Sequence, residues 1–168
     1  MIHYILKIVK LIISQHKKGN KLIFIGNGGS ASIASHIATD FLKNAKIPAI
    51  TFNDVSLITC ISNDLGYENV FQKPLDLLAK NGDILVSISS SGKSQNILNA
   101  TKAARNKKCF IITLSGFSKK NPLRKLGDIN FYIPSYSYGV VEIAHLSICH
   151  CIVDTIIPNR KTKWTGSK

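Results

Sequence analysis

Short apolar runs alternate with longer amphipathic segments along most of the chain. The runs are continuous and rich in β-branched residues, which is typical of strands that helices cover on both faces. We expect these strands at residues 21–26, 47–52, 83–89, 109–115 and 129–133.

Between these runs, apolar residues recur every three or four positions, which is the spacing of a helix face. This periodicity predicts helices over residues 2–17, 31–43, 69–80, 94–107 and 141–157. Strands that alternate with helices indicate an α/β fold, here a three-layer, doubly wound arrangement around a five-stranded parallel sheet. Because no repeat or linker interrupts the pattern, we assign residues 1–158 to one domain and expect a basic, disordered tail at 159–168.

The composition places this domain inside the cell. The apolar start of the chain is broken by Lys7 and Lys10, so it lacks the continuous apolar region of a signal peptide, and no later run is long enough to span a bilayer. We therefore expect a cytoplasmic protein without membrane partners. The cysteines lie inside apolar stretches, which predicts reduced, buried thiols at Cys60, Cys109, Cys149 and Cys151.

A net charge of +13 raises the question of nucleic-acid binding. Outside the tail, however, the basic residues are scattered over helix ends and turns instead of forming one patch. Scattered charge is typical of solvated surface. We therefore expect no nucleic-acid partner.

Two unusual loops follow predicted strands at the edge where such sheets bind ligands. The first, Gly26-Asn27-Gly28-Gly29-Ser30-Ala31, allows close backbone approach and opens a helix whose amides can hold an anion. The second offers four hydroxyls, a glycine and a lysine between a buried strand and a helix, from Ser89 to Ser94. This setting is unusual for a flexible serine linker and predicts a phosphate cradle.

The glycine loop also satisfies G-x-G-x-x-A, and Asp54 after the next strand could serve as a ribose-binding acid. A dinucleotide-binding domain is therefore an alternative. It leaves the serine loop without a role.

A third candidate is the pair His36 and Asp40 on the helix after the glycine loop. Residues four apart share a helix face, so the two side chains can bind one metal ion. A hydrogen-bonded surface pair is the simpler interpretation of such spacing. The position beside the glycine loop favours the metal.

Several motifs together resemble the SIS (sugar isomerase) domain, most closely its phosphoheptose isomerase branch. They are G-N-G-G-S-A at 26–31, N-D-V-S at 53–56, N-D-x-G at 63–66, S-x-S-G-x-S at 89–94 and G-V-V-E-I-A-H at 139–145 with a second histidine at 150. The resemblance covers about residues 20–157. It implies an aldose–ketose isomerase that converts sedoheptulose 7-phosphate to D-glycero-D-manno-heptose 7-phosphate for heptose precursors of lipopolysaccharide or capsule.

The resemblance also implies roles for individual residues. Asp40 and His150 would be the acid/base pair, and zinc would be held by His36, Asp40, Glu142 and His150. The sugar would be contacted by Asn27, Gly28, Gly29, Asn63, Asp64 and Glu142, and the phosphate by Ser89, Ser90, Ser91 and Ser94. The family builds its pocket between the subunits of a homotetramer. The alternative within the family is a non-catalytic SIS module that senses a sugar phosphate or docks a protein partner.

The sequence departs from the family pattern at positions that matter for this site. Asp40 is one methylene shorter than the usual Glu, Glu142 replaces a neutral amide, and an arginine expected between Asp40 and Asp54 is missing. Glu142 and His150 are eight residues apart, roughly 12 Å along a helix, so they can share one ion only if Glu142 lies at or before the first turn. His145 points away from the Glu142–His150 stripe and is expected to be structural.

Overall fold

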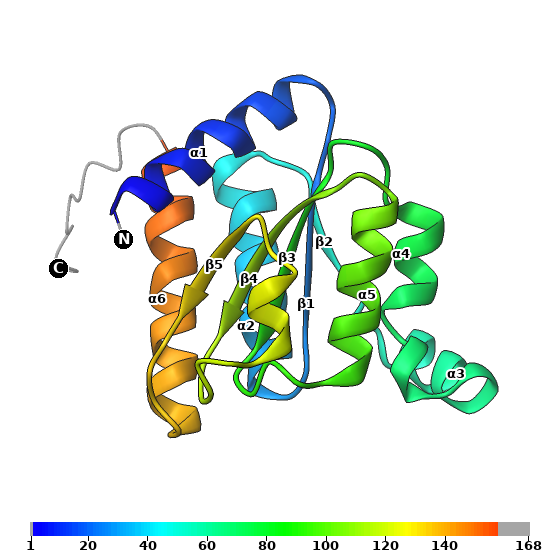
Figure 1. Cartoon of the computed structure of the whole chain (residues 1–168). Helices are drawn as coiled ribbons and strands as arrows, with labels where there is room; N and C mark the ends of the chain where they lie inside the picture. Colours follow the sequence, from blue (N-terminus) through cyan, green and yellow to red (C-terminus); the bar gives the residue numbers. More distant parts are fainter. Residues whose placement is uncertain (1, 158–168) are drawn as a thin grey trace, which may run out of the picture.

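Five parallel strands form one sheet in the order β2-β1-β3-β4-β5 (Figure 1). The computed structural model describes residues 2–157. The strands are β1 Leu22–Gly26, β2 Ala49–Thr51, β3 Ile84–Ser89, β4 Phe110–Ser115 and β5 Ile129–Tyr132. Every pairing between neighbours is parallel. The predicted α/β class and all five predicted strands are confirmed, with β2 shorter than expected.

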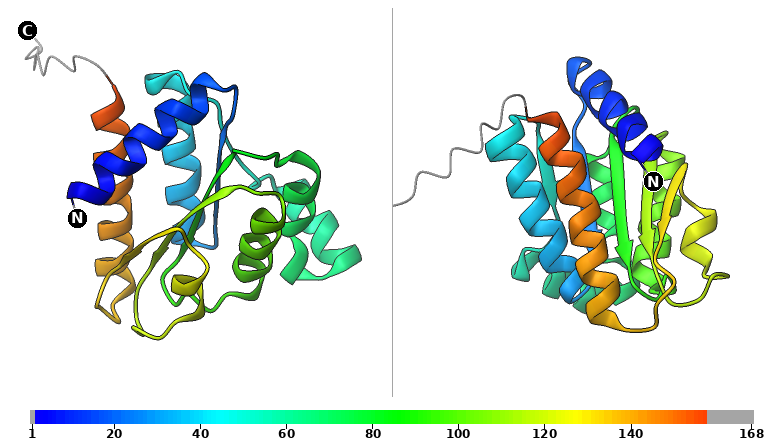
Figure 2. Two further views of the ribbon diagram at one scale, coloured as in Figure 1. Left: turned by 45° about the horizontal axis from the view of Figure 1, so that its top comes forward. Right: turned by 90° about the vertical axis from the view of Figure 1, so that its left-hand side faces the viewer.

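Helices cover both faces of the sheet. They are α1 Ile2–Lys17, α2 Gly29–Asp40, α3 Val55–Leu65, α4 Gln72–Leu78, α5 Gln95–Asn106 and α6 Tyr138–Ile156. A π-helical turn, Phe41–Ala45, extends α2, and single 3-10 turns lie at Tyr67–Asn69 and Pro122–Lys125. Helices α1, α2 and α6 lie together on one face, and α4 and α5 lie on the other (Figure 2).

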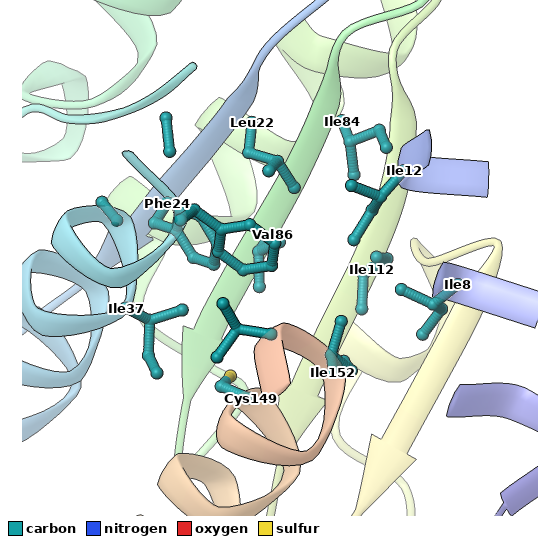
Figure 3. Packing of buried hydrophobic residues seen from close by; sticks show 14 of the residues in the cluster. Ile8, Ile12, Leu22, Phe24, Ile37, Ile84, Val86, Ile112, Cys149 and Ile152 are labelled. Atoms are coloured by element: carbon teal, nitrogen blue, oxygen red, sulfur yellow. The ribbon is translucent and has the colours of Figure 1, made fainter. Parts of the chain in front are cut away.

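The helices on both faces of the sheet explain why the apolar runs are continuous. In β1, Leu22 and Phe24 belong to the core under α1, α2 and α6, whereas Ile23 and Ile25 belong to the core under α4 and α5. Figure 3 shows the first of these cores, where side chains of α1 and α6 meet those of the sheet. Burying one such Ile or Leu side chain stabilises the fold by about 1.5–3 kcal/mol.

The helix α3 was not predicted. The Asp54 side chain caps it by accepting a hydrogen bond from the Leu57 amide at 2.9 Å, and Gly66, with φ 87°, ends it. None of its residues is fully buried, although Leu57, Ile58 and Ile61 rest on the second core. These three apolar residues have helical spacing, and the cap at Asp54 and the stop at Gly66 were also readable in the sequence, so the available signals were overlooked.

Two other expectations need correction. Only Cys109 and Cys149 are buried thiols, and burial raises the pKa of the Cys149 thiol to about 12. Cys60 and Cys151 are exposed, on α3 and α6.

Helix α6 begins at Tyr138, three residues earlier than predicted. The tail expected at 159–168 lies outside the described residues.

Within residues 2–157, α6 alone has the length and apolar composition of a membrane-spanning helix. It lies against α1, α2 and β4, and its buried residues Ile148, Cys149, Ile152 and Val153 belong to the first core. These side chains have a place in the fold, whereas Val140 and Ile143 of the same helix are exposed.

The chain changes direction across the sheet between β1 and β3. From β1 it moves outward to β2, and it then returns to the other side of β1 to form β3 and continue to β5. At such a switch point the loops after the two central strands separate and leave a crevice. Both unusual loops of the sequence lie there.

Candidate functional site

A cavity of about 230 Å³ lies at this switch point, between the loop after β1 and the loop after β3. It also borders the first turns of α6. Its lining consists of Asn27, Gly28, Gly29, Ser30, Ile88, Ser89, Ser90, Ser91, Ser94, Tyr138 and Glu142. The structure therefore brings together the glycine loop, the whole set of predicted serines and one of the predicted acids.

The serine loop is ordered by its own hydroxyls. Ser89 Oγ accepts a hydrogen bond from the Gly92 amide at 3.2 Å, and Ser91 Oγ accepts one from the Lys93 amide at 3.2 Å. Ser90 Oγ is different, because it is buried and finds no partner among the described residues. A buried hydroxyl without a partner costs about 1–3 kcal/mol. Because Ser90 belongs to the cavity lining, a ligand oxygen that reached this hydroxyl would supply the missing partner.

The Asn121 side chain lies next to Gly92 of the serine loop. Its Nδ2 donates to the Ser118 carbonyl at 2.8 Å, and its Oδ1 lies where a Cβ atom on Gly92 would come within 2.2 Å. Gly92 also has φ 62°, a conformation that L side chains rarely adopt. The loop after β3 therefore requires glycine at this position for two independent reasons.

The electrostatics of the cavity favour an anion on one side. Helices α2, α5 and α6 begin at Gly29, Gln95 and Tyr138, so the cavity lies at three helix N-termini, where the helix dipole is positive. On the other side stands the Glu142 carboxylate, whose Oε1 would lie 2.5 Å from a Cβ on Gly29. The cavity is therefore polarised, with serines and helix ends opposite one acid.

A second group of polar side chains lies where α2 packs against α6. His36 Nε2 lies 3.6 Å from Asp40 Oδ2, and His150 Nδ1 lies 3.7 Å from the same oxygen. The two imidazole rings meet edge to face with centroids 5.2 Å apart. Three of the four residues predicted to hold metal are thus adjacent.

This group fits a divalent metal ion. The three donor atoms all lie within 4.8 Å of one another. Donors around one zinc ion at bond lengths near 2.1 Å are separated by roughly 3.4 Å, close to the distances seen here. Two imidazoles and one carboxylate are a donor set that zinc accepts, and three protein ligands leave a position for substrate.

Glu142 is not part of this group within one chain. It lies in the second turn of α6, so the condition for sharing an ion with His150 is not met, and the two residues remain about 12 Å apart along the axis. Its carboxylate lies instead at the cavity, against Gly29.

Asn63 and Asp64 do not line the cavity. Both are exposed on α3, where Asn63 Nδ2 donates to Asp64 Oδ1 at 2.8 Å, and α3 lies at the rim of the molecule (Figure 1). Asp54 is the N-cap of α3, so its carboxylate already has a structural partner. This weakens the dinucleotide alternative, which needed that acid for a ribose.

His145 faces the core, as expected from its helix face. Its Nε2 donates to the Ser115 carbonyl at 3.2 Å, and Nδ1 finds no partner among the described residues. Burial lowers the pKa of His145 to about 4, so the ring is neutral at pH 7.

Three residues at or beside the cavity were not predicted from the sequence. Tyr138 was outside the predicted helix, and no motif pointed to Asn121 or to Asn96, which is buried beside Asn27. For Asn96 the available signal was a polar amide at the start of a predicted helix, directly after the serine loop.

Comparison with known proteins gives a consistent result. The model of the SIS domain matches residues 2–116. The phosphoheptose isomerase of Cytophaga hutchinsonii is 38% identical over 155 residues, covering 89% of this chain and 81% of that protein.

Solved structures agree. A phosphoheptose isomerase from Francisella tularensis superposes with a TM-score of 0.84 at 33% identity, over 90% of this chain and 83% of that one. The one from Neisseria gonorrhoeae gives a TM-score of 0.84 at 29% identity, over 90% and 84%. The chain belongs to the SIS domain family and, within it, to the phosphoheptose isomerase branch.

Proposed function

We propose that this chain is an aldose–ketose isomerase that converts sedoheptulose 7-phosphate to D-glycero-D-manno-heptose 7-phosphate, a precursor of surface heptose. The observation that carries the proposal is the buried, unpartnered Ser90 hydroxyl in a cavity lined by four further serines and bordered by helix N-termini. Such a site suits a phosphate. The names of the relatives supply the class of sugar, a phosphorylated heptose.

The spacing of the two groups of side chains supports a substrate of this length. Gly29 at the cavity and His36 at the candidate metal group are seven residues apart on α2, which is about 10 Å along the helix. Carbon–carbon bonds are about 1.5 Å long, so an extended seven-carbon chain with a terminal phosphate reaches roughly 10 Å. A heptose phosphate held by the serine loop therefore extends its carbonyl end toward Asp40 and His150.

The chemistry moves a proton from C1 to C2 of the sugar through a cis-enediol. In this proposal Asp40 and His150 form the acid/base pair, one for the carbon-bound proton and the other for the protons on the oxygens. Their side chains already meet at 3.7 Å. A zinc ion held by His36, Asp40 and His150 would supply positive charge for the oxygen that becomes negative.

The quaternary structure belongs to the same proposal. We expect a homotetramer with sites between subunits, in which exposed Asn63 and Asp64 on α3 contact the sugar in a neighbouring pocket, and Glu142 joins a metal set only across such an interface. Exposed apolar side chains on several helices, among them Ile2, Leu77 and Ile143, support burial against other subunits. The cytoplasm is the expected location.

Incubation with sedoheptulose 7-phosphate and analysis of the products tests this function. The aldose 7-phosphate should accumulate to an equilibrium mixture. Binding of the ketose without any conversion would instead support a non-catalytic sensing or docking module.

A further inference from the structure

Asn27 and Asn96 form a reciprocal pair of side-chain hydrogen bonds. Nδ2 of each residue donates to Oδ1 of the other, and both distances are 2.9 Å. Asn27 lies in the glycine loop after β1, whereas Asn96 lies in the first turn of α5, two residues after Ser94 of the serine loop. Only 2% of Asn96 is exposed. The pair therefore joins the two loops that form the cavity.

The orientation of the Asn96 amide is fixed by the backbone. Its Oδ1 also accepts a hydrogen bond from the Ile97 amide at 2.9 Å, and a backbone N–H can only donate. A flip of the Asn96 side chain would place its NH₂ group against this N–H. Because Asn96 cannot flip, the Asn27 amide opposite is held in one orientation as well.

Tyr67 strengthens this orientation from the other side. Its hydroxyl donates to Asn27 Oδ1 at 3.0 Å. Asn27 Oδ1 therefore receives two donors, from Tyr67 and from Asn96, which matches the two lone pairs of an amide oxygen. The Nδ2 group of Asn27 donates one N–H to Asn96, and its second N–H has no partner among residues 2–157.

We infer that Asn96 and Tyr67 are positioning residues that fix the side chain of Asn27 as a hydrogen-bond donor to the sugar phosphate. Since Asn27 lines the cavity and its oxygen is saturated, it offers a ligand an N–H and no acceptor. The matching atom of the substrate is an acceptor oxygen, on the phosphate, the carbonyl or a hydroxyl. The identity of the substrate rests on the proposed function, but the orientation of the Asn27 amide does not.

A double-mutant cycle tests this inference. The measurements are kcat, KM and the dissociation constant of sedoheptulose 7-phosphate for Asn27→Ala, Asn96→Ala and the double variant. Losing one properly oriented hydrogen bond should raise KM roughly 3- to 10-fold in Asn96→Ala. In the Asn27→Ala background the same substitution should change KM by less than about 2-fold, because Asn96 then has no amide to orient. Equal losses in both backgrounds would overturn the inference and leave Asn96 a purely structural residue.

Two further variants test whether a rise in KM could come from misfolding instead of from the orientation of Asn27. Tyr67→Phe removes only a hydroxyl from a residue that is 52% exposed, so it should fold, and its smaller rise in KM should also vanish when Asn27 is alanine. Gln95→Ala changes the exposed neighbour of Asn96 and should leave KM unchanged. A Tyr67→Phe effect that persists in the Asn27→Ala background would contradict the positioning role.

A readout without substrate separates this inference from the proposed function. In ¹⁵N NMR spectra of the wild-type chain, one proton of the Asn27 NH₂ group should be protected and shifted by its bond to Asn96, and this shift should disappear in Asn96→Ala. If the wild type neither binds nor converts sedoheptulose 7-phosphate, the proposed function is wrong. If the Asn27 resonances are the same with and without Asn96, the positioning role is wrong.

Discussion

Asp40 on α2 and His150 on α6 approach each other to 3.7 Å, measured from Oδ2 to Nδ1. The contact exists because α2 and α6 lie side by side on one face of the sheet, although they are far apart in the sequence (Figure 2). His36 reaches the same carboxylate from within α2. An acid with two imidazoles is thereby assembled by helix packing.

Zinc binding should depend on the group formed by His36, Asp40 and His150. His36→Ala should weaken zinc binding at least 10-fold, because it removes one of the donors that surround the ion. Titration calorimetry and elemental analysis of the purified protein measure the effect. His3→Ala, an exposed histidine on α1, is the matched control and should bind zinc like the wild type. Equal zinc affinity in both variants would remove the metal from this site.

The Ser90 hydroxyl should matter for ligand binding and not for folding. Its substitution by alanine leaves no group without a partner, so the free energy of unfolding should stay the same or rise slightly. The KM for the sugar phosphate should increase by about 10-fold or more, since hydrogen bonds to a charged group are worth roughly 1.5–3 kcal/mol.

Ser118→Ala is the control for that experiment, because Ser118 lies outside the cavity lining. Urea unfolding and steady-state kinetics of both variants are sufficient. A destabilised Ser90→Ala protein with an unchanged KM would reverse the interpretation and make Ser90 a structural residue.

Gly92 should be irreplaceable even by alanine. The added Cβ would meet Asn121 Oδ1 at 2.2 Å, and φ 62° is strained for any residue with a side chain. We expect a loss of about 1–3 kcal/mol in stability together with a large rise in KM, because the hydroxyls of the loop move. Gly19→Ala is a useful comparison: φ is also positive there, 77°, but the space is open and no ligand group is near. If both variants lost stability equally and neither changed KM, the loop would not depend on this contact.

Much of the fold followed from sequence because the apolar runs are buried on both faces. Ile84, Leu85 and Val86 alternate between the two cores, so this part of β3 is apolar on both sides. Such runs separated by helix-period segments define a parallel α/β sheet with little ambiguity. The two loops were also readable, because their composition is unusual at the end of a strand.

What the sequence could not provide were distances between segments remote in the chain. The approach of His150 to Asp40 and the pairing of Asn27 with Asn96 depend on which helices share a face of the sheet. Nor does local periodicity say where a helix starts. Helix α6 begins early enough to bring Tyr138 to the cavity and to keep Glu142 away from the other metal candidates.

Stability should fall in mild acid through His145. Its pKa is about 4 in the folded protein because burial disfavours the charged ring, whereas the unfolded chain has the ordinary value near 6.5. The unfolded state therefore binds more protons between these values, and stability is lost as pH falls through this window. Between pH 7 and pH 5 the loss from this residue is about 2 kcal/mol.

Urea unfolding of the wild type and of His145→Gln at both pH values checks this origin. The glutamine amide can still donate to the Ser115 carbonyl, but it does not titrate. The pH-dependent loss should therefore be about 2 kcal/mol smaller in the variant. An identical loss in the two proteins would assign the acid sensitivity to other groups.

Incubation with sedoheptulose 7-phosphate in D₂O shows whether the chain transfers a proton between C1 and C2 of the sugar. The wild type should form the aldose 7-phosphate with deuterium at C2, whereas Asp40→Asn and His150→Ala, with zinc restored, should slow both conversion and deuterium incorporation by at least ~100-fold while still binding the ketose. Binding of the ketose by the wild type with neither aldose formation nor deuterium incorporation would contradict the account.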